Sequence, residues 1–134
     1  MGNTHAFGRL DADSAGRLLL RLYDGALASM TAARERVAAG DCSGKGGHIS
    51  RAMDILAELT RSLDLGHGLA RNLAILYLCC TARLLRASAR METGPLDMAV
   101  SILAALRQAF AGALPTARRG AQRARVLTFG VAAR

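Results

Sequence analysis

The sequence predicts an all-α protein that folds as an antiparallel up-down four-helix bundle, on two observations. Its 134 residues are 51% hydrophobic but only 4% aromatic, with no Trp and two Pro, so the core must consist of Leu, Ile, Met and Ala, which favour helices. Apolar residues also recur three and four positions apart in four segments separated by short breaks. A chain of this length fits one domain with its own core.

The first two helices follow from this spacing. We expect the first helix to start at Asp13 and Ser14, which are suitable N-caps, and to end at Gly40. Its core face contains Leu19, Leu22, Tyr23, Ala26, Met30, Ala33 and Val37. Residues 41–44 read as a turn, and the second helix ends near the break at residues 65–68. The core face of the second helix contains Ile49, Met53, Leu56, Leu59 and Leu63.

The third helix, from about residue 69 to residue 91, is apolar on two opposite faces. One face contains Leu69, Leu73, Leu76, Tyr77, Cys80, Leu84 and Ala87. The opposite face contains Ile75, Leu78, Ala82, Leu85 and Ala89. One apolar face is enough to close a bundle core. The second face therefore predicts contact with a partner.

The fourth helix begins near Pro95, which suits a first helical turn, and we expect Pro115 to end it. Its core face contains Ala99, Ile102, Leu103, Leu106 and Phe110. Short connections make sequential helices pack side by side, which gives a bundle over residues 13–114. Residues 115–134 contain too few regularly spaced apolar residues to pack, and we expect a disordered basic tail there.

The charge distribution argues against a nucleic-acid-binding body. The net charge is +8, but five arginines and no acidic residue follow Pro115, which leaves +3 for the rest of the chain. The basic character is therefore partly a property of the tail. A module that binds nucleic acid through its arginine tail is an alternative, and so is a self-associating structural bundle. Binding that depends steeply on salt would identify the first of these.

The sequence contains no pattern of catalytic, metal-binding or cofactor-binding residues, so we predict a protein that is not an enzyme. Asp54 and Glu58 have the i,i+4 spacing of metal ligands, but no histidine joins them. The three histidines lie in three different segments. The glycines around Lys45 do not have the order of a phosphate-binding loop, and no strand precedes them. We therefore expect a binding protein without a cofactor.

The cysteines and the N-terminal sequence favour the cytoplasm. Three cysteines, Cys42, Cys79 and Cys80, form no CxxC motif, and neighbours in a helix rarely form a disulfide bond, so a reducing compartment suits them. The first residues show no targeting signal. No apolar run approaches the roughly 20 residues that cross a bilayer, so we expect no membrane span.

Several segments resemble the flagellar export chaperone family FliS. The first helix contains Leu22-Tyr23-Asp24-Gly25-Ala26, the LYDGA signature of that family. Further segments that are similar to the family follow in the same order as in its members: Ala39-Gly40-Asp41, Ile49-Ser50-Arg51-Ala52, Leu63-Asp64, Leu69-Ala70-Arg71-Asn72-Leu73, Leu76-Tyr77, Arg83-Leu84-Leu85-Arg86-Ala87-Ser88 and Ala109-Phe110. The resemblance covers about residues 13–114.

The resemblance implies a four-helix bundle that binds the C-terminal, otherwise disordered segment of flagellin. Such a chaperone keeps flagellin from polymerising in the cytosol and helps to deliver it to the type III export gate, where FlhA is the implied second partner. It also implies an N-terminal segment that caps the client groove, here residues 1–12, in which Phe7 and Leu10 take the place of the apolar anchors. Leu78 and Cys79 replace residues that are usually acidic and aromatic.

We therefore predict a partner-binding surface around the second face of the third helix. Leu20 and Leu27, on a flank of the first helix, are candidates too, and Arg71 could orient an acidic client residue. Tyr23 is included although its spacing fits the bundle core as well. The full set is Phe7, Leu10, Leu20, Tyr23, Leu27, Arg71, Ile75, Leu78, Cys79, Ala82 and Leu85. The same apolar face could instead form a homodimer.

Overall fold

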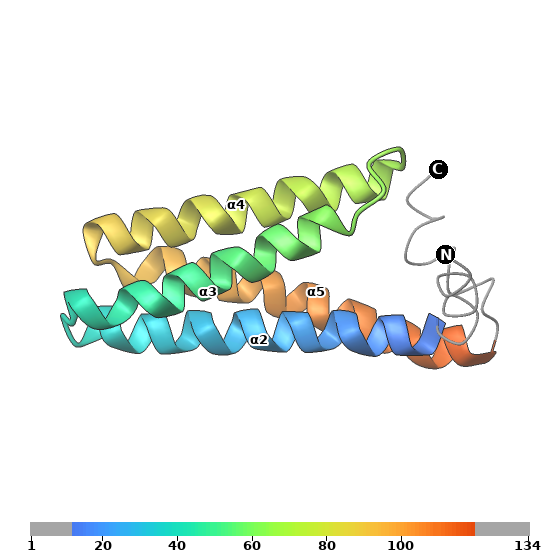
Figure 1. The fold of residues 1–134 in the computed structure, drawn as a ribbon, viewed down its shortest axis with the longest axis horizontal. Coiled ribbons are helices and arrows are strands. Elements are labelled where there is room, and N and C mark those ends of the chain that lie inside the picture. The colour runs from blue at the N-terminus through green and yellow to red at the C-terminus, as the bar shows by residue number, and fades with distance from the viewer. Residues whose placement is uncertain (1–11, 120–134) are drawn as a thin grey trace.

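A computed structural model describes residues 12–119 of the chain, and the side chains of residues 14–113. The described residues form four helices and no strand, which confirms the predicted all-α bundle. These helices are α2 (Ala12–Ala38), α3 (Cys42–Arg61), α4 (Gly68–Arg90) and α5 (Thr93–Arg119). Figure 1 shows that consecutive helices run in opposite directions. Helices α2 and α4 each pack against α3 and α5 and lie diagonally across the bundle from each other.

The connection between α2 and α3 is shorter than the sequence predicts. Gly40 has a φ of 74°, a conformation that suits glycine and ends α2. Asp41 then acts as the N-cap of α3, because its Oδ1 accepts a hydrogen bond from the Gly44 backbone N–H at 2.9 Å. The prediction of a turn over residues 41–44 is therefore wrong. These residues are the cap and first turn of α3, since the cap satisfies a backbone donor there.

Two further helix boundaries also differ from the prediction. Helix α5 continues through Pro115 to Arg119, so the bundle helix extends five residues into the predicted tail. A proline removes only its own N–H donor and crowds one carbonyl, and a helix can continue with one hydrogen bond fewer. Helix α2 begins at Ala12, which places Asp13 and Ser14 in its first turn instead of before it. Residues 120–134 lie outside the described part of the chain.

The core is aliphatic with a small aromatic centre. Its buried members come from all four helices: Tyr23, Ala26, Met30, Ala33, Val37, Ile49, Ala52, Leu56, Leu59, Leu73, Tyr77, Cys80, Leu84, Ala87, Leu96, Ala99 and Leu103. The Tyr23 ring stacks on Phe110, with centroids 5.6 Å apart. Gly25 lies where α2 and α3 approach closely, because a Cβ added there would be 3.3 Å from Ile55 Cδ1.

Leu76 does not belong to the core, and its predicted place on the core face of α4 is wrong. The side chain is only half-buried and is not among those packed against the core cluster. Helix α4 instead buries Ala70, Leu73, Tyr77, Cys80, Leu84 and Ala87, spaced alternately three and four residues apart. On a helix, position 76 lies about 60° from position 73, at the border of this face.

Two surface ion pairs connect α2 with α5. Arg107 Nε donates to Asp24 Oδ1 at 2.6 Å, and Arg34 Nε donates to Asp97 Oδ1 at 2.5 Å. The hydrogen bond from Arg107 lowers the pKa of the Asp24 carboxyl below its usual value. Both pairs are exposed, so they favour the pairing of these two helices without dominating stability.

Candidate functional site

An apolar surface runs along the outer side of α4, opposite its buried face. Ile75, Leu78 and Leu85 are 58%, 68% and 52% exposed, and Ala82 between them is exposed as well. We call these four residues the outer stripe. They follow one another at spacings of three, four and three residues, so they form one row about 15 Å long. The structure thus confirms the exposure of the second apolar face of this helix.

The predicted neighbours of the outer stripe occupy its edges. Arg71 lies one turn before Ile75, and its Nη1 donates to the Leu65 carbonyl oxygen at 3.2 Å, in the connection between α3 and α4. The Arg71 side chain is exposed, so its remaining donors face solvent. Cys79 is half-buried and borders the stripe. Both side chains are placed where a molecule bound on the stripe could reach them.

The structure does not bring the α2 candidates to the outer stripe. Tyr23 is fully buried, and its hydroxyl is 2.5 Å from that of Tyr77, so it offers no surface to a partner in this conformation. Leu27 packs against the core, and Leu20 is half-buried. Because α2 lies diagonally across the bundle, these two leucines lie on another side of the molecule. The candidates in the N-terminal segment, Phe7 and Leu10, lie outside the described residues.

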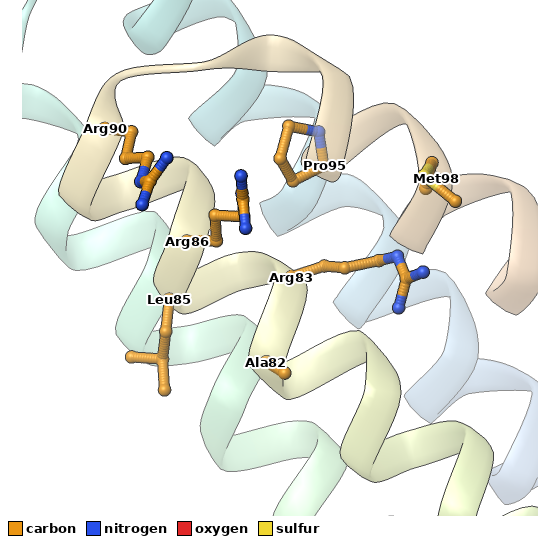
Figure 2. A pocket seen from close by; sticks show the side chains of 7 residues that line it. All are labelled: Ala82, Arg83, Leu85, Arg86, Arg90, Pro95 and Met98. Carbon is orange, nitrogen blue, oxygen red and sulfur yellow. The ribbon is translucent and has the colours of Figure 1, made fainter.

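Beside the outer stripe lies a surface hollow that the sequence analysis missed. It has a volume of about 690 Å³ and lies between the second half of α4 and the first turns of α5. Its lining consists of Ala82, Arg83, Leu85, Arg86, Arg90, Pro95 and Met98. Figure 2 shows the three arginine side chains extending from α4 on the side of α5. The spacing of the arginines was visible in the sequence, but the contribution of α5 depends on tertiary packing.

Two buried polar groups of α4, the Cys80 thiol and the Tyr77 hydroxyl, have raised pKa values. Burial raises the pKa of the Cys80 thiol to about 11, so the thiol is neutral near pH 7. Burial also raises the pKa of the Tyr77 hydroxyl above its usual value. In the described part of the chain, no three His, Cys, Asp or Glu side chains gather as metal ligands would. The outer side of α4 offers a partner apolar and cationic contacts.

Two segments of the described chain are long and apolar enough to cross a membrane by length and composition alone. They are α4 and residues 93–113 of α5. This is weak evidence for a span, because the core helices of a soluble bundle have the same character. Both helices contribute one face to the common core, and α4 contains four arginines.

The sequence and the fold agree with one known family. No curated protein matches the chain. The model of the family described as flagellar protein FliS matches residues 7–117. This range includes all of α2, α3 and α4 and most of α5. The match extends beyond the LYDGA segment to the outer stripe and the hollow. The chain therefore belongs to the flagellar protein FliS family, a family of flagellar export chaperones.

Proposed function

We propose that this chaperone binds the C-terminal segment of flagellin along the outer stripe of α4. Binding keeps flagellin from polymerising in the cytoplasm until the complex reaches the type III export apparatus. FlhA receives the complex there. Membership of the FliS family supports a cytoplasmic role in flagellum assembly.

The observation that supports this proposal most directly is the exposure of the outer stripe. Ile75, Leu78 and Leu85 are large aliphatic side chains that the bundle leaves in water. Each is already partly covered, so covering the rest of each side chain would contribute roughly 1–2 kcal/mol before ordering costs. Part of this gain is offset by the ordering of the client segment, so these three side chains would act as anchors within a larger interface.

The spacing of the outer stripe favours a helical client segment. A row with spacings of three, four and three residues matches the a and d positions of two helices packed side by side. An amphipathic helix could therefore lay its own apolar row beside Ile75, Leu78 and Leu85. Arg71, at one end of the row, would then meet an acidic residue of the client.

Calorimetric titration with flagellin and with its isolated C-terminal segment tests the proposal. Leu78→Asp should weaken both interactions about tenfold to a hundredfold, because it removes one apolar contact and adds a charge that must lose its water. Ala57→Asp adds the same charge at an exposed position of α3 and should leave the affinity unchanged. Equal flagellin affinity for the Leu78→Asp variant and the parent would contradict the proposal.

A homodimer formed through the outer stripe is the second candidate, because the same exposed row could pair with itself. Light scattering over a range of protein concentrations distinguishes the two. A monomer that binds flagellin one-to-one supports the chaperone surface. A dimer that Leu78→Asp dissociates, without any change in flagellin affinity, assigns the stripe to self-association.

A further inference from the structure

The hollow between α4 and α5 differs chemically from the outer stripe, although the two share Ala82 and Leu85. Arg83, Arg86 and Arg90 are spaced i, i+3 and i+7, so they project from one side of α4. That side lies about 90° around the helix from the centre of the outer stripe. The hollow therefore faces a different direction and combines positive charge with apolar contacts.

The positive charge of the hollow is largely uncompensated. Helix α4 contains four arginines and no acidic residue. Arg86 Nε lies 3.7 Å from Glu92 Oε1 in an exposed pair, which is a weak interaction. Among the described residues, Arg83 and Arg90 form no ion pair, and Asp97 on α5 pairs with Arg34 instead. At least two guanidinium groups are thus available to an anionic ligand.

The apolar part of the lining is also exposed. Met98 from α5 and Leu85 from α4 are both more than half exposed, and Pro95 and Ala82 complete the apolar lining. Arginine and methionine are enriched in protein interfaces, where arginine forms bidentate pairs with carboxylates. Most lining side chains are exposed, so the hollow is open along the surface and suits a chain segment better than an enclosed small molecule.

We propose that this hollow is a docking site for an acidic segment of a partner protein, in which carboxylates meet the three arginines and an apolar side chain contacts Met98. Charge excludes two other occupants. Residues 120–134 of this chain contain three arginines and no acid, and a second copy of the same face is positive as well. Nucleic acid is less suited because no aromatic side chain in the lining can stack on a base.

Fluorescence anisotropy with a labelled synthetic peptide tests the proposal. The peptide carries glutamates and leucines on one helical face, and its matched partner has glutamine at each glutamate. The parent protein should bind the glutamate peptide and should bind the glutamine peptide at least about tenfold more weakly. The triple variant Arg83→Gln/Arg86→Gln/Arg90→Gln should lose at least about tenfold in affinity for the glutamate peptide.

A second triple variant provides the charge control. Arg21→Gln/Arg51→Gln/Arg61→Gln changes the net charge equally at exposed positions outside both the hollow and the proposed flagellin surface, and it should cost less than about threefold. Circular dichroism verifies that each variant is folded, and Arg83→Gln alone replaces the first triple variant should that one unfold. Met98→Ser should weaken binding of the glutamate peptide through the loss of its apolar contact.

Several outcomes would overturn the proposal. If the two triple variants lose the same affinity for the glutamate peptide, the peptide responds to overall charge only. Tighter, hollow-dependent binding of a single-stranded oligonucleotide or of phosphatidylserine vesicles would assign the hollow to nucleic acid or membrane instead. Leu78 lies on the outer stripe, outside the hollow, so Leu78→Asp should leave the affinity for the glutamate peptide within about threefold. The test of the hollow is therefore independent of the test of flagellin binding.

Discussion

Replacing Tyr23 by Phe should destabilise the bundle although the aromatic ring is retained. Tyr23 and Tyr77 are 0% and 2% exposed, and their hydroxyl oxygens lie 2.5 Å apart. In the Tyr23→Phe variant the Tyr77 hydroxyl stays buried but loses its partner. An unsatisfied buried hydroxyl costs about 1–3 kcal/mol, so the free energy of unfolding should fall by that amount. The stacking of residue 23 on Phe110 should remain.

The double variant Tyr23→Phe/Tyr77→Phe tests whether the two hydroxyls satisfy each other. It removes both hydroxyls, so no polar group is left unsatisfied between the rings. Its free energy of unfolding should lie within about 1 kcal/mol of the parent value, well above the sum of the two single effects. Urea unfolding followed by circular dichroism measures all four proteins. Additive losses in the double variant would refute the idea that the two hydroxyls satisfy each other.

The same pair predicts a dependence of stability on alkaline pH. Burial raises the pKa of both tyrosine hydroxyls above their usual value near 10. The unfolded chain therefore releases these protons at a lower pH than the folded chain, and stability should fall as the pH rises above about 10. The parent should lose more stability between pH 9 and pH 11 than the double phenylalanine variant, as measured by thermal unfolding. Equal losses would show that the tyrosines do not titrate as their burial requires.

Two further predictions concern other side chains of α4. Leu84→Asp should prevent folding, because Leu84 is fully buried and an unpaired carboxylate there costs several kcal/mol. Leu76→Asp should instead leave a folded helical bundle, because Leu76 is only half-buried. Circular dichroism distinguishes the two, and an unfolded Leu76→Asp variant would place Leu76 back in the core. Exposed Cys42 should react with iodoacetamide at pH 8 while Cys80 stays protected, because burial raises the pKa of the Cys80 thiol to about 11. Mass spectrometry of the labelled protein measures the reaction at each cysteine. Rapid labelling of Cys80 would contradict the prediction.

The outer stripe and most of the core could be predicted from the sequence. The angle between two residues on one helix depends only on their separation in the chain. The buried row of Leu73, Tyr77 and Leu84 and the exposed row of Ile75 and Leu78 were therefore both visible in the spacing. The roles of the outer stripe and of Phe7 and Leu10 in binding flagellin stay predictions.

Helix boundaries were less predictable because they depend on single hydrogen bonds. The side chain of Asp41 could belong to a turn or to an N-cap, and only its contact with the Gly44 N–H decides between them. Pro115 can end a helix or lie within one, and here the helix continues. Leu76 lies at the border of a face, where a small rotation of the helix decides its burial.

The sequence by itself thus determined the fold class, the family and the two faces of α4, because helical periodicity and motif order are local properties of one chain. Only the tertiary structure decided which side chains of different helices meet. It joined the hydroxyls of Tyr23 and Tyr77, and it placed Met98 of α5 in the lining of the same hollow as Arg83 and Arg86 of α4. Periodicity sets the direction of a side chain around its own helix, but the distance and vertical offset between helices depend on how the whole core packs.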